Sequence, residues 1–226
     1  MSVRPTALHG LVEIESDVHR DDRGFFLESY SRRRYQELGI DEEFVQDNHS
    51  HSKKGVLRGL HYQDMSAPMG KLVHCSRGAI LDVAVDLRVG SPTFAEWYAV
   101  ELNDTNWRQL FVPVGFGHGF VVLSDLADVE YKCTGYYSKS AEGVIAWNDP
   151  QIGIKWPEKS PLLSDRDAKG MSLKEYVMNP AFIYSPHPAL PRKRGRENEP
   201  AVPRKRGREN EPAVPRKRGR DNSGAK

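Results

Sequence analysis

Apolar and polar residues alternate in short runs along the first 185 residues, and this pattern is the strongest constraint on the fold. In the run 79–88 every second residue from Leu81 to Leu87 is aliphatic, and the residues between them are Asp, Ala and Asp. A period of two places alternate side chains on opposite faces of a β-strand. Similar runs occur at 44–50, 56–62, 71–76, 94–101, 107–112, 118–123 and 129–134.

Turn sequences separate these runs, as at Lys54-Gly55 and Arg77-Gly78, and helical patterns are scarce. Only the run 31–38 has a helical pattern, with Ser29 or Ser31 as its N-cap and Gly39 as its end. Many short strands with little helix predict an all-β fold, a jelly-roll barrel of antiparallel strands with a few short helices. Several strands line the mouth of such a barrel, so residues far apart in sequence can meet there.

The composition changes near residue 186. Residues 1–185 hold nearly all the aromatic and β-branched residues and are enough to bury one domain-sized core. From Pro191 the sequence Pro-Arg-Lys-Arg-Gly-Arg recurs with a period of 12 residues. This part contains 13 Lys and Arg against 5 Asp and Glu, a net charge of +8, while the rest of the chain carries −6. We therefore divide the chain into a folded domain, 1–185, and a basic repeat tail, 186–226.

The tail has no apolar face to bury, so the sequence predicts that it is disordered. Arg and Lys clusters attract phosphate, which would suit an arm that binds nucleic acid. No aromatic residue is interspersed with the basic ones to stack on bases. We interpret the tail as an appended extension without a selected role, and we do not expect nucleic acid as a partner.

Two further features concern location and redox state. No apolar run approaches the roughly 20 residues needed to span a bilayer, and the first residues lack the apolar core of a signal peptide. Both observations favour a cytoplasmic protein with no membrane partner. Cys75 and Cys133 are not spaced as a CxxC motif, and both lie in apolar alternating runs. We expect them to be reduced core residues.

The spacing of His49 and His51 places two imidazoles on one face of a strand, as in many metal sites. A cupin-type metal site also needs a carboxylate a few residues later, but Lys53-Lys54-Gly55 follows here. We therefore expect hydrogen-bonding roles for both histidines and no metal site. A metal-dependent cupin oxygenase that uses His49, His51 and His118 is kept as a remote alternative.

Four other residues have the chemistry of acid–base catalysis on a carbon acid. His61, in Arg-Gly-Leu-His-Tyr-Gln, can remove a proton, and Lys71 can stabilise a developing negative charge. Tyr131 can donate a proton, and Asp167 can orient the imidazole. No nucleotide-cofactor motif accompanies them. Arg58 precedes His61 by three positions, so the two face opposite sides of the strand unless a bulge intervenes.

The sequence Pro-Val-Gly-Phe-Gly-His-Gly-Phe at 113–120 predicts a tight turn, followed by a strand that begins with His118. Together with other segments it resembles the dTDP-4-dehydrorhamnose 3,5-epimerase family of the cupin superfamily. The segments that carry the resemblance are 22–28, 46–50, 57–63, 112–120, 131–137 and 147–156. The resemblance extends from about residue 10 to residue 169 and excludes the tail.

The resemblance implies a jelly-roll barrel that usually forms a homodimer and needs no cofactor. It implies an isomerase that epimerises C3 and C5 of a dTDP-4-keto-6-deoxy sugar, with His61 as the base, Tyr131 as the proton donor, Asp167 as the partner of the base and Lys71 as the enolate-stabilising cation. The implied substrate contacts are Arg23, Glu28, Gln46, Asn48, Arg58, His118, Tyr137, Glu142 and Arg166. Tyr137 matches the residue that stacks on thymine. At Arg166 many members of the family have Lys, and the two side chains differ in hydrogen-bonding geometry.

Related enzymes epimerise only C3 or only C5, or move the ketone to C3, and the sequence does not discriminate among these outcomes. A third class of function is a non-catalytic sugar-nucleotide or nucleic-acid binder that depends on the basic tail. That alternative predicts that deletion of 186–226 destroys activity, whereas the epimerase interpretation predicts little loss.

Overall fold

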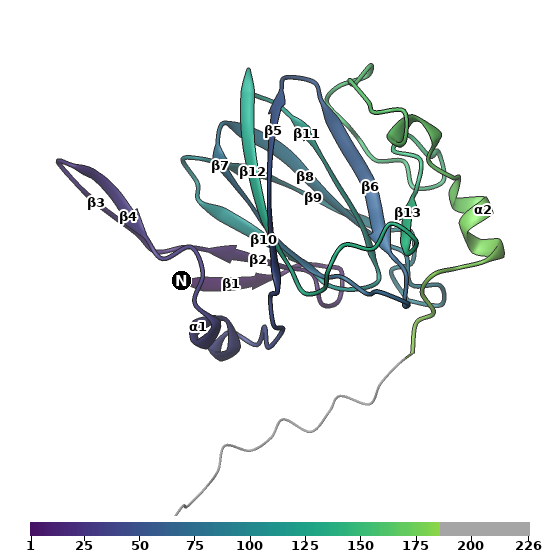
Figure 1. The fold of residues 1–226 in the computed structure, drawn as a ribbon, viewed down its shortest axis with the longest axis horizontal. Helices are drawn as coiled ribbons and strands as arrows, with labels where there is room; N and C mark the ends of the chain where they lie inside the picture. Colours follow the sequence, from purple (N-terminus) through teal and green to yellow (C-terminus); the bar gives the residue numbers. More distant parts are fainter. Residues whose placement is uncertain (186–226) are drawn as a thin grey trace, which may run out of the picture. The chain divides into compact units, whose positions relative to one another are not determined.

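The computed structural model describes residues 1–185, which fold into two antiparallel β-sheets that face each other (Figure 1). The tail predicted for 186–226 lies outside the described residues. The six-stranded sheet has the order β1 (Ser2–Pro5), β2 (Val12–Glu15), β10 (Arg108–Val112), β7 (Lys71–Arg77), β12 (Leu126–Cys133) and β5 (Gln46–Lys53). The five-stranded sheet has the order β13 (Glu142–Val144), β6 (Leu57–Gln63), β11 (Phe116–Val122), β8 (Ala79–Asp86) and β9 (Trp97–Asn103). The predicted all-β jelly-roll architecture is confirmed.

All eight runs that were predicted as strands form strands, with ends that differ by a few residues. The predicted helix is α1 (Arg32–Glu37), and its N-cap is Ser31, whose side chain makes no capping hydrogen bond. Gly39 follows the helix with a φ of 88°, a left-handed conformation that glycine adopts without steric cost. The 3-10 helix η1 (Asp167–Lys169) and the helix α2 (Leu173–Met178) were not predicted.

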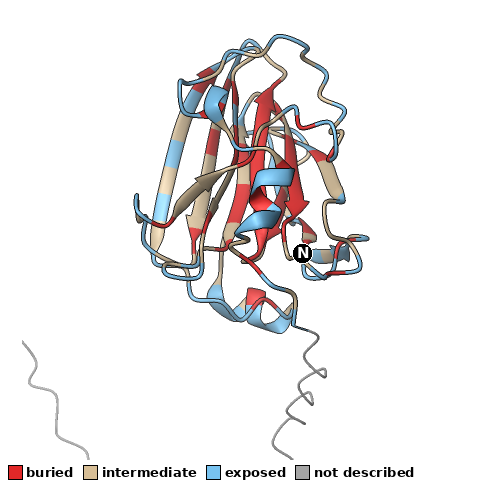
Figure 2. Ribbon diagram, turned by 90° about the vertical axis from the view of Figure 1, so that its right-hand side faces the viewer, coloured by how far each residue is buried: buried red, intermediate tan, exposed pale blue. Residues whose placement is uncertain are grey.

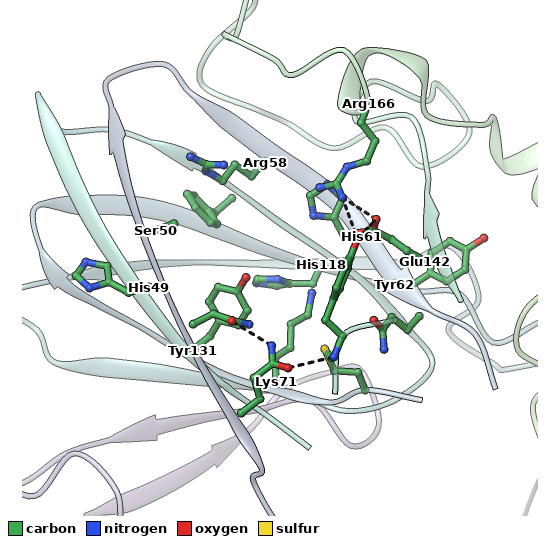
Figure 3. Close-up of a pocket in the computed structure, with 16 residues that line it drawn as sticks. His49, Ser50, Arg58, His61, Tyr62, Lys71, His118, Tyr131, Glu142 and Arg166 are labelled. Carbon is green, nitrogen blue, oxygen red and sulfur yellow. Dashed lines mark hydrogen bonds and ion pairs between the residues drawn. The ribbon is translucent and has the colours of Figure 1, made fainter. Parts of the chain in front are cut away.

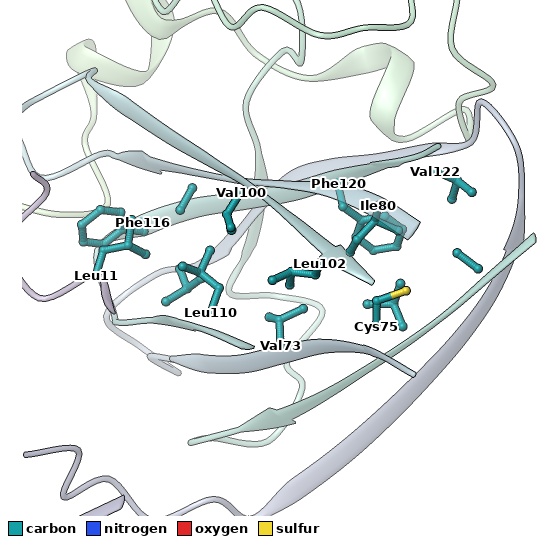
Figure 4. Packing of buried hydrophobic residues seen from close by; sticks show 14 of the residues in the cluster. Leu11, Val73, Cys75, Ile80, Val100, Leu102, Leu110, Phe116, Phe120 and Val122 are labelled. Carbon is teal, nitrogen blue, oxygen red and sulfur yellow. The ribbon is translucent and has the colours of Figure 1, made fainter. Parts of the chain in front are cut away.

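The main hydrophobic core lies between the two sheets (Figure 4). Val73 and Leu110 project into it from the six-stranded sheet, and Ile80, Leu102 and Phe120 project from the five-stranded sheet. Burial of one such aliphatic side chain contributes about 1.5–3 kcal/mol. This core holds the sheets together at one end of the barrel and leaves room for polar side chains at the other.

The five-stranded sheet is buried on both faces. Val83 and Val85 of β8 project away from the barrel and pack under the C-terminal segment, where Tyr176 of α2 and Phe182 cover them. As a result β8 and β11 are almost completely buried along their length (Figure 2). The polar residues of β8 are therefore inside the protein as well, which the alternating pattern alone did not reveal.

A third pairing, between β3 (Val18–Asp21) and β4 (Gly24–Leu27), forms a hairpin that projects away from both sheets (Figure 1). Phe25 and Phe26 of this hairpin are 50% and 71% exposed. Cys75 and Cys133 are both buried and free, as predicted. Within the described part of the chain, no helix combines the length and the apolar character needed to cross a membrane.

Candidate active site

A cavity of about 460 Å³ opens between the two sheets and gathers most of the predicted site residues (Figure 3). Strands from both sheets contribute to its walls. The predicted residues that line it are Gln46, Asn48, Arg58, His61, Lys71, His118, Tyr131, Tyr137, Glu142 and Arg166. Residues separated by up to 120 positions therefore meet at one place, as expected for the mouth of a barrel.

His61 on β6 is paired with Asp167, which begins η1. The imidazole Nε2 lies 2.5 Å from Asp167 Oδ1, and the hydroxyl of Ser164 donates to Asp167 Oδ2 at 2.8 Å. Burial lowers the pKa of His61 from its usual value, and the hydrogen bond to Asp167 opposes that shift. The imidazole is therefore neutral at neutral pH, and the hydrogen bond to Asp167 holds it in one orientation. A general base needs both of these properties.

Tyr131 on β12 lies on the wall that faces His61, because the two residues come from opposite sheets (Figure 3). The ladder places it beside Asn48 of β5 and Val73 of β7. Burial raises the pKa of the Tyr131 phenol. The hydroxyl group therefore keeps its proton at neutral pH and can give it to a bound molecule.

Lys71, at the start of β7, lies between these two walls in Figure 3. Its ammonium group is 5.9 Å from the centroid of the Tyr131 ring. Burial lowers the pKa of Lys71, whereas Cys133, Asp82 and Glu142 act in the opposite direction. The cavity thus brings together an imidazole, a phenol and an ammonium group, which can act as a base, a proton donor and a stabilising cation.

Arg58 also faces the cavity, on the same side of β6 as His61. The pairing of β6 with β11 shifts register between His118 and Phe120, so an extra residue of β6 is accommodated there. The bulge that the three-residue spacing required is present.

A series of hydrogen bonds connects the polar side chains at the rim of the cavity. Arg166 Nη1 donates to both carboxylate oxygens of Glu142, at 2.6 and 2.7 Å. The Tyr137 hydroxyl donates to Glu142 Oε2 at 3.1 Å. Arg166 Nη2 lies 3.1 Å from His61 Nε2, the nitrogen that also faces Asp167. Arg166 therefore connects Glu142 at the rim to His61.

His118 faces the cavity from β11 and is paired with a residue that the sequence analysis did not select. Its Nε2 lies 2.8 Å from Oδ1 of Asp82, which is completely buried. The available signal was a carboxylate at an alternate position of a strand in which every other residue except Asp86 is aliphatic. Its significance depended on both faces of β8 being covered.

Two predicted substrate contacts do not lie at this cavity. Arg23, in the turn of the β3–β4 hairpin, is paired with Asp21, and Glu28 is paired with Arg34. Both remain predictions.

The three histidines of the metal-site alternative do not converge. His49 and His51 both approach Asp128 Oδ1, at 3.2 and 2.6 Å, whereas His118 faces Asp82. Within residues 1–185, no three His, Cys, Asp or Glu side chains are arranged to hold a metal ion.

Comparison with known proteins identifies the family. The family model described as dTDP-4-dehydrorhamnose 3,5-epimerase matches residues 5–175, most of the chain. The chain belongs to the dTDP-4-dehydrorhamnose 3,5-epimerase family. The resemblance found in the sequence motifs is thereby confirmed.

Several proteins of this family are similar to this chain over most of their length. The dTDP-4-dehydrorhamnose 3,5-epimerase of Salmonella typhimurium is 51% identical over 180 residues, which are 79% of this chain and 98% of that protein. The dTDP-4-dehydrorhamnose 3-epimerase of Streptomyces niveus is 40% identical over 176 residues, which are 77% of this chain and 85% of that protein. The 3,5-epimerase from Legionella pneumophila, solved in complex with dTDP-4-keto-L-rhamnose, is 47% identical with a TM-score of 0.78. That alignment covers 81% of this chain and 98% of the Legionella chain.

Proposed function

We propose that this protein epimerises C3 and C5 of dTDP-4-dehydro-6-deoxy-D-glucose, giving dTDP-4-dehydro-L-rhamnose for dTDP-L-rhamnose biosynthesis. The observation that supports it best is the placement of His61 and Tyr131 on facing walls of one cavity, with Lys71 between them. Inversion at carbon requires that a proton leave one face of the sugar and return to the other. An acid and a base on opposite sides of the substrate provide that geometry.

The mechanism depends on the ketone at C4, which acidifies the hydrogens at C3 and C5. His61, oriented by Asp167, takes the proton from one of these carbons, and the electron pair moves to the C4 oxygen as an enolate. The ammonium group of Lys71 stabilises the negative charge on that oxygen. When the electron pair returns to carbon, Tyr131 delivers a proton from the opposite face. Exchange with solvent then removes the proton from His61 and returns one to Tyr131, so that the same four groups can repeat these steps at the second carbon. No hydride moves.

The comparisons favour the double epimerisation over a single one. Identity to the Salmonella 3,5-epimerase is 51%, whereas identity to the Streptomyces 3-epimerase is 40%. Single epimerisation and ketone migration remain the outcomes that the experiment must separate.

The decisive experiment is proton NMR of the product formed from dTDP-4-dehydro-6-deoxy-D-glucose in D2O. We expect deuterium at both C3 and C5 and the L-rhamno configuration. Deuterium at one carbon only would identify a single epimerase, and a ketone at C3 would identify a ketoisomerase. No exchange at either carbon would refute the proposal.

The role of His61 is tested in the same assay with His61→Ala, which should abolish exchange at both carbons. A matched control is His51→Ala, because His51 projects from β5 toward Asp128 and its side chain is 56% exposed. The control should keep full exchange. Exchange that persists in His61→Ala would exclude His61 as the base.

We also propose that the protein acts as a homodimer in which the β3–β4 hairpin of one protomer reaches the cavity of its partner. Projecting aromatic side chains such as Phe25 and Phe26 are typical of contact surfaces. The Arg23 side chain, 90% exposed, contacts Asp21 and does not line the cavity of its own chain. A partner's hairpin would supply Arg23 and Glu28, which the family resemblance assigns to the substrate.

Mixing of two inactive variants tests this arrangement. His61→Ala and Arg23→Ala homodimers should each be impaired, and subunit exchange between them should create one intact site per heterodimer. Activity should then recover on mixing. Heterodimers that form without regaining activity would place both residues in one protomer's site, and a monomer in sedimentation analysis would exclude the dimer.

A further inference from the structure

The proposed mechanism does not use Asp82, although this carboxylate lies inside the barrel next to the site. Its neighbours at alternate positions of β8, Ile80 and Ala84, belong to the core between the sheets. Asp82 is completely buried, and its Oδ1 accepts a hydrogen bond from His118 Nε2 at 2.8 Å. Its Oδ2 has no hydrogen-bond partner among the described residues.

A buried carboxylate oxygen without a partner is costly, because burial removes the water that would solvate its charge. Such a group persists where a nearby positive charge compensates it. Lys71 can supply such a charge, because its side chain extends toward His118, the partner of Asp82, in Figure 3. Across residues 1–185, the Lys71 ammonium group makes no ion pair with any carboxylate within 4.0 Å.

We propose that Asp82 is a positioning residue that keeps Lys71 protonated and holds His118 in place. The ammonium group of Lys71 can then stabilise the negative charge on the enolate oxygen. A direct ion pair would block Lys71, since its ammonium group must remain free to approach the substrate. A carboxylate behind His118 gives the cation a compensating charge without competing for its hydrogen bonds. The remaining ionisable groups near Lys71 are His61, Arg58, Tyr131, Cys133, Glu142 and Arg166.

Among the carboxylates near Lys71, Asp82 differs from Glu142 in one respect. Arg166 already neutralises Glu142 through two hydrogen bonds. Asp82 has a histidine on one oxygen and nothing on the other. The charge of Asp82 is therefore the one available to Lys71. Burial lowers the pKa of Lys71, whereas Asp82 and Glu142 each act to raise it.

This inference rests on the proposed function, in which Lys71 stabilises an enolate, but its test does not need turnover. The ammonium group of Lys71 is titrated by NMR in protein labelled with 15N at the lysine side chains, with Lys71→Met to assign the signal. In Asp82→Asn we expect the pKa of Lys71 to fall by about one unit or more, because an opposite charge nearby is lost. The kcat should fall at least about tenfold above neutral pH, where Lys71 would lose its proton, and by less at lower pH.

A matched control is Asp149→Asn, another buried aspartate, which caps Leu173 and the turn at Gln151 away from the cavity. It should lower thermal stability without moving the titration of Lys71. If Asp82→Asn fails to fold, Asp82→Ser is titrated instead, because it also removes the charge and should show the same fall in the pKa of Lys71. A Lys71 titration that is unchanged in the folded Asp82 variant would overturn the inference. A wild-type protein without deuterium exchange would instead refute the proposed function.

Discussion

Arg58 and His61 point into the same cavity although they are three positions apart on one strand. Their partners on β11, Phe120 and His118, are two positions apart, so β6 contains one residue more than β11 between the paired positions. Gly59 and Gly119 make this possible. A Cβ atom on Gly119 would lie 2.7 Å from the carbonyl oxygen of Arg58 and 3.0 Å from the Cα of Gly59. The close contact of the two glycines therefore sets the direction of the base.

The first prediction concerns Gly119→Ala. The added methyl group contacts backbone atoms that cannot rotate away, so the strands must separate, which costs about 1–3 kcal/mol of unfolding free energy. We expect kcat/KM to fall by more than tenfold, because His61 and Arg58 are displaced together. Urea unfolding and steady-state kinetics measure the two effects.

The control for this variant is Gly39→Ala, which follows α1 and has no atom within 4 Å of the added Cβ. Its positive φ makes it costly for stability, by about 1 kcal/mol, but it should keep normal kinetics. Equal kinetic losses in the two variants would show that general destabilisation, and not the bulge, affects the site.

The second prediction concerns Asp167→Asn. The carboxylate of Asp167 raises the pKa of His61, against the larger effect of burial. Its loss should lower the pKa of His61 further, so that the acidic limb of the kcat/KM profile moves to lower pH. A weaker and less well oriented base should also lower kcat by at least about a hundredfold. A pH–rate profile from pH 4.5 to 9 checks both effects, and an acidic limb in its original place would argue against the pairing.

The third prediction separates removal of the proton from its return. Tyr131→Phe keeps the ring, which packs against the core between the sheets, and removes the hydroxyl group. We expect the formation of epimerised product to slow by about a hundredfold or more. Exchange of substrate hydrogen with solvent should persist, since His61 is intact. NMR of recovered substrate in D2O checks this expectation, and complete loss of exchange would assign to Tyr131 a role in the first step.

The strands and most of the site could be predicted from local sequence. The alternation of 79–88 and its counterparts located eight strands, and the motifs around His61, His118 and Tyr131 identified residues on both walls of one cavity. These features depend on local pattern and on motifs whose order along the chain is informative. Whether Arg58 and His61 share a face could not be settled, because a bulge depends on the partner strand.

Asp82 shows where the sequence was insufficient. Its position in an alternating strand predicts a solvent-facing side chain when only one face of the sheet is covered. The C-terminal segment with Tyr176 and Phe182 covers the other face of this sheet, and Val83 then packs outward while Asp82 faces the barrel. The assignment of Asp82 therefore required a contact between residues about 90 positions apart. Arg23 and Glu28 remain predictions, since both lie away from the cavity of their own chain.

The fourth prediction concerns the tail. The described domain is secured near its end, where the backbone amide of Tyr184 donates to the carbonyl of Val89 at 2.9 Å. A protein that ends at Ser185 should therefore keep its fold and its kcat/KM within about twofold, because the sequence of the tail offers no apolar face to add to a core. Thermal unfolding and the epimerase assay on both lengths check this. A large loss of activity at unchanged stability would assign the repeats a function.

The fifth prediction concerns Arg166, where many members of the family have lysine. Its guanidinium group lies 3.1 Å from His61 Nε2 and lowers the pKa of His61, whereas Asp167 raises it. Arg166→Gln should thus move the acidic limb of kcat/KM to higher pH, in the direction opposite to Asp167→Asn.

Arg166→Lys is the matched variant for this test. Lysine keeps the positive charge but cannot bind both oxygens of Glu142 and contact the imidazole of His61 at the same time. We therefore expect a smaller shift of the acidic limb and a weaker interaction with Glu142. Parallel pH–rate profiles of the three variants at positions 166 and 167 measure the shifts. An acidic limb that moves to lower pH in Arg166→Gln would mean that the arginine affects His61 through Asp167, by positioning that carboxylate, and not through its own charge.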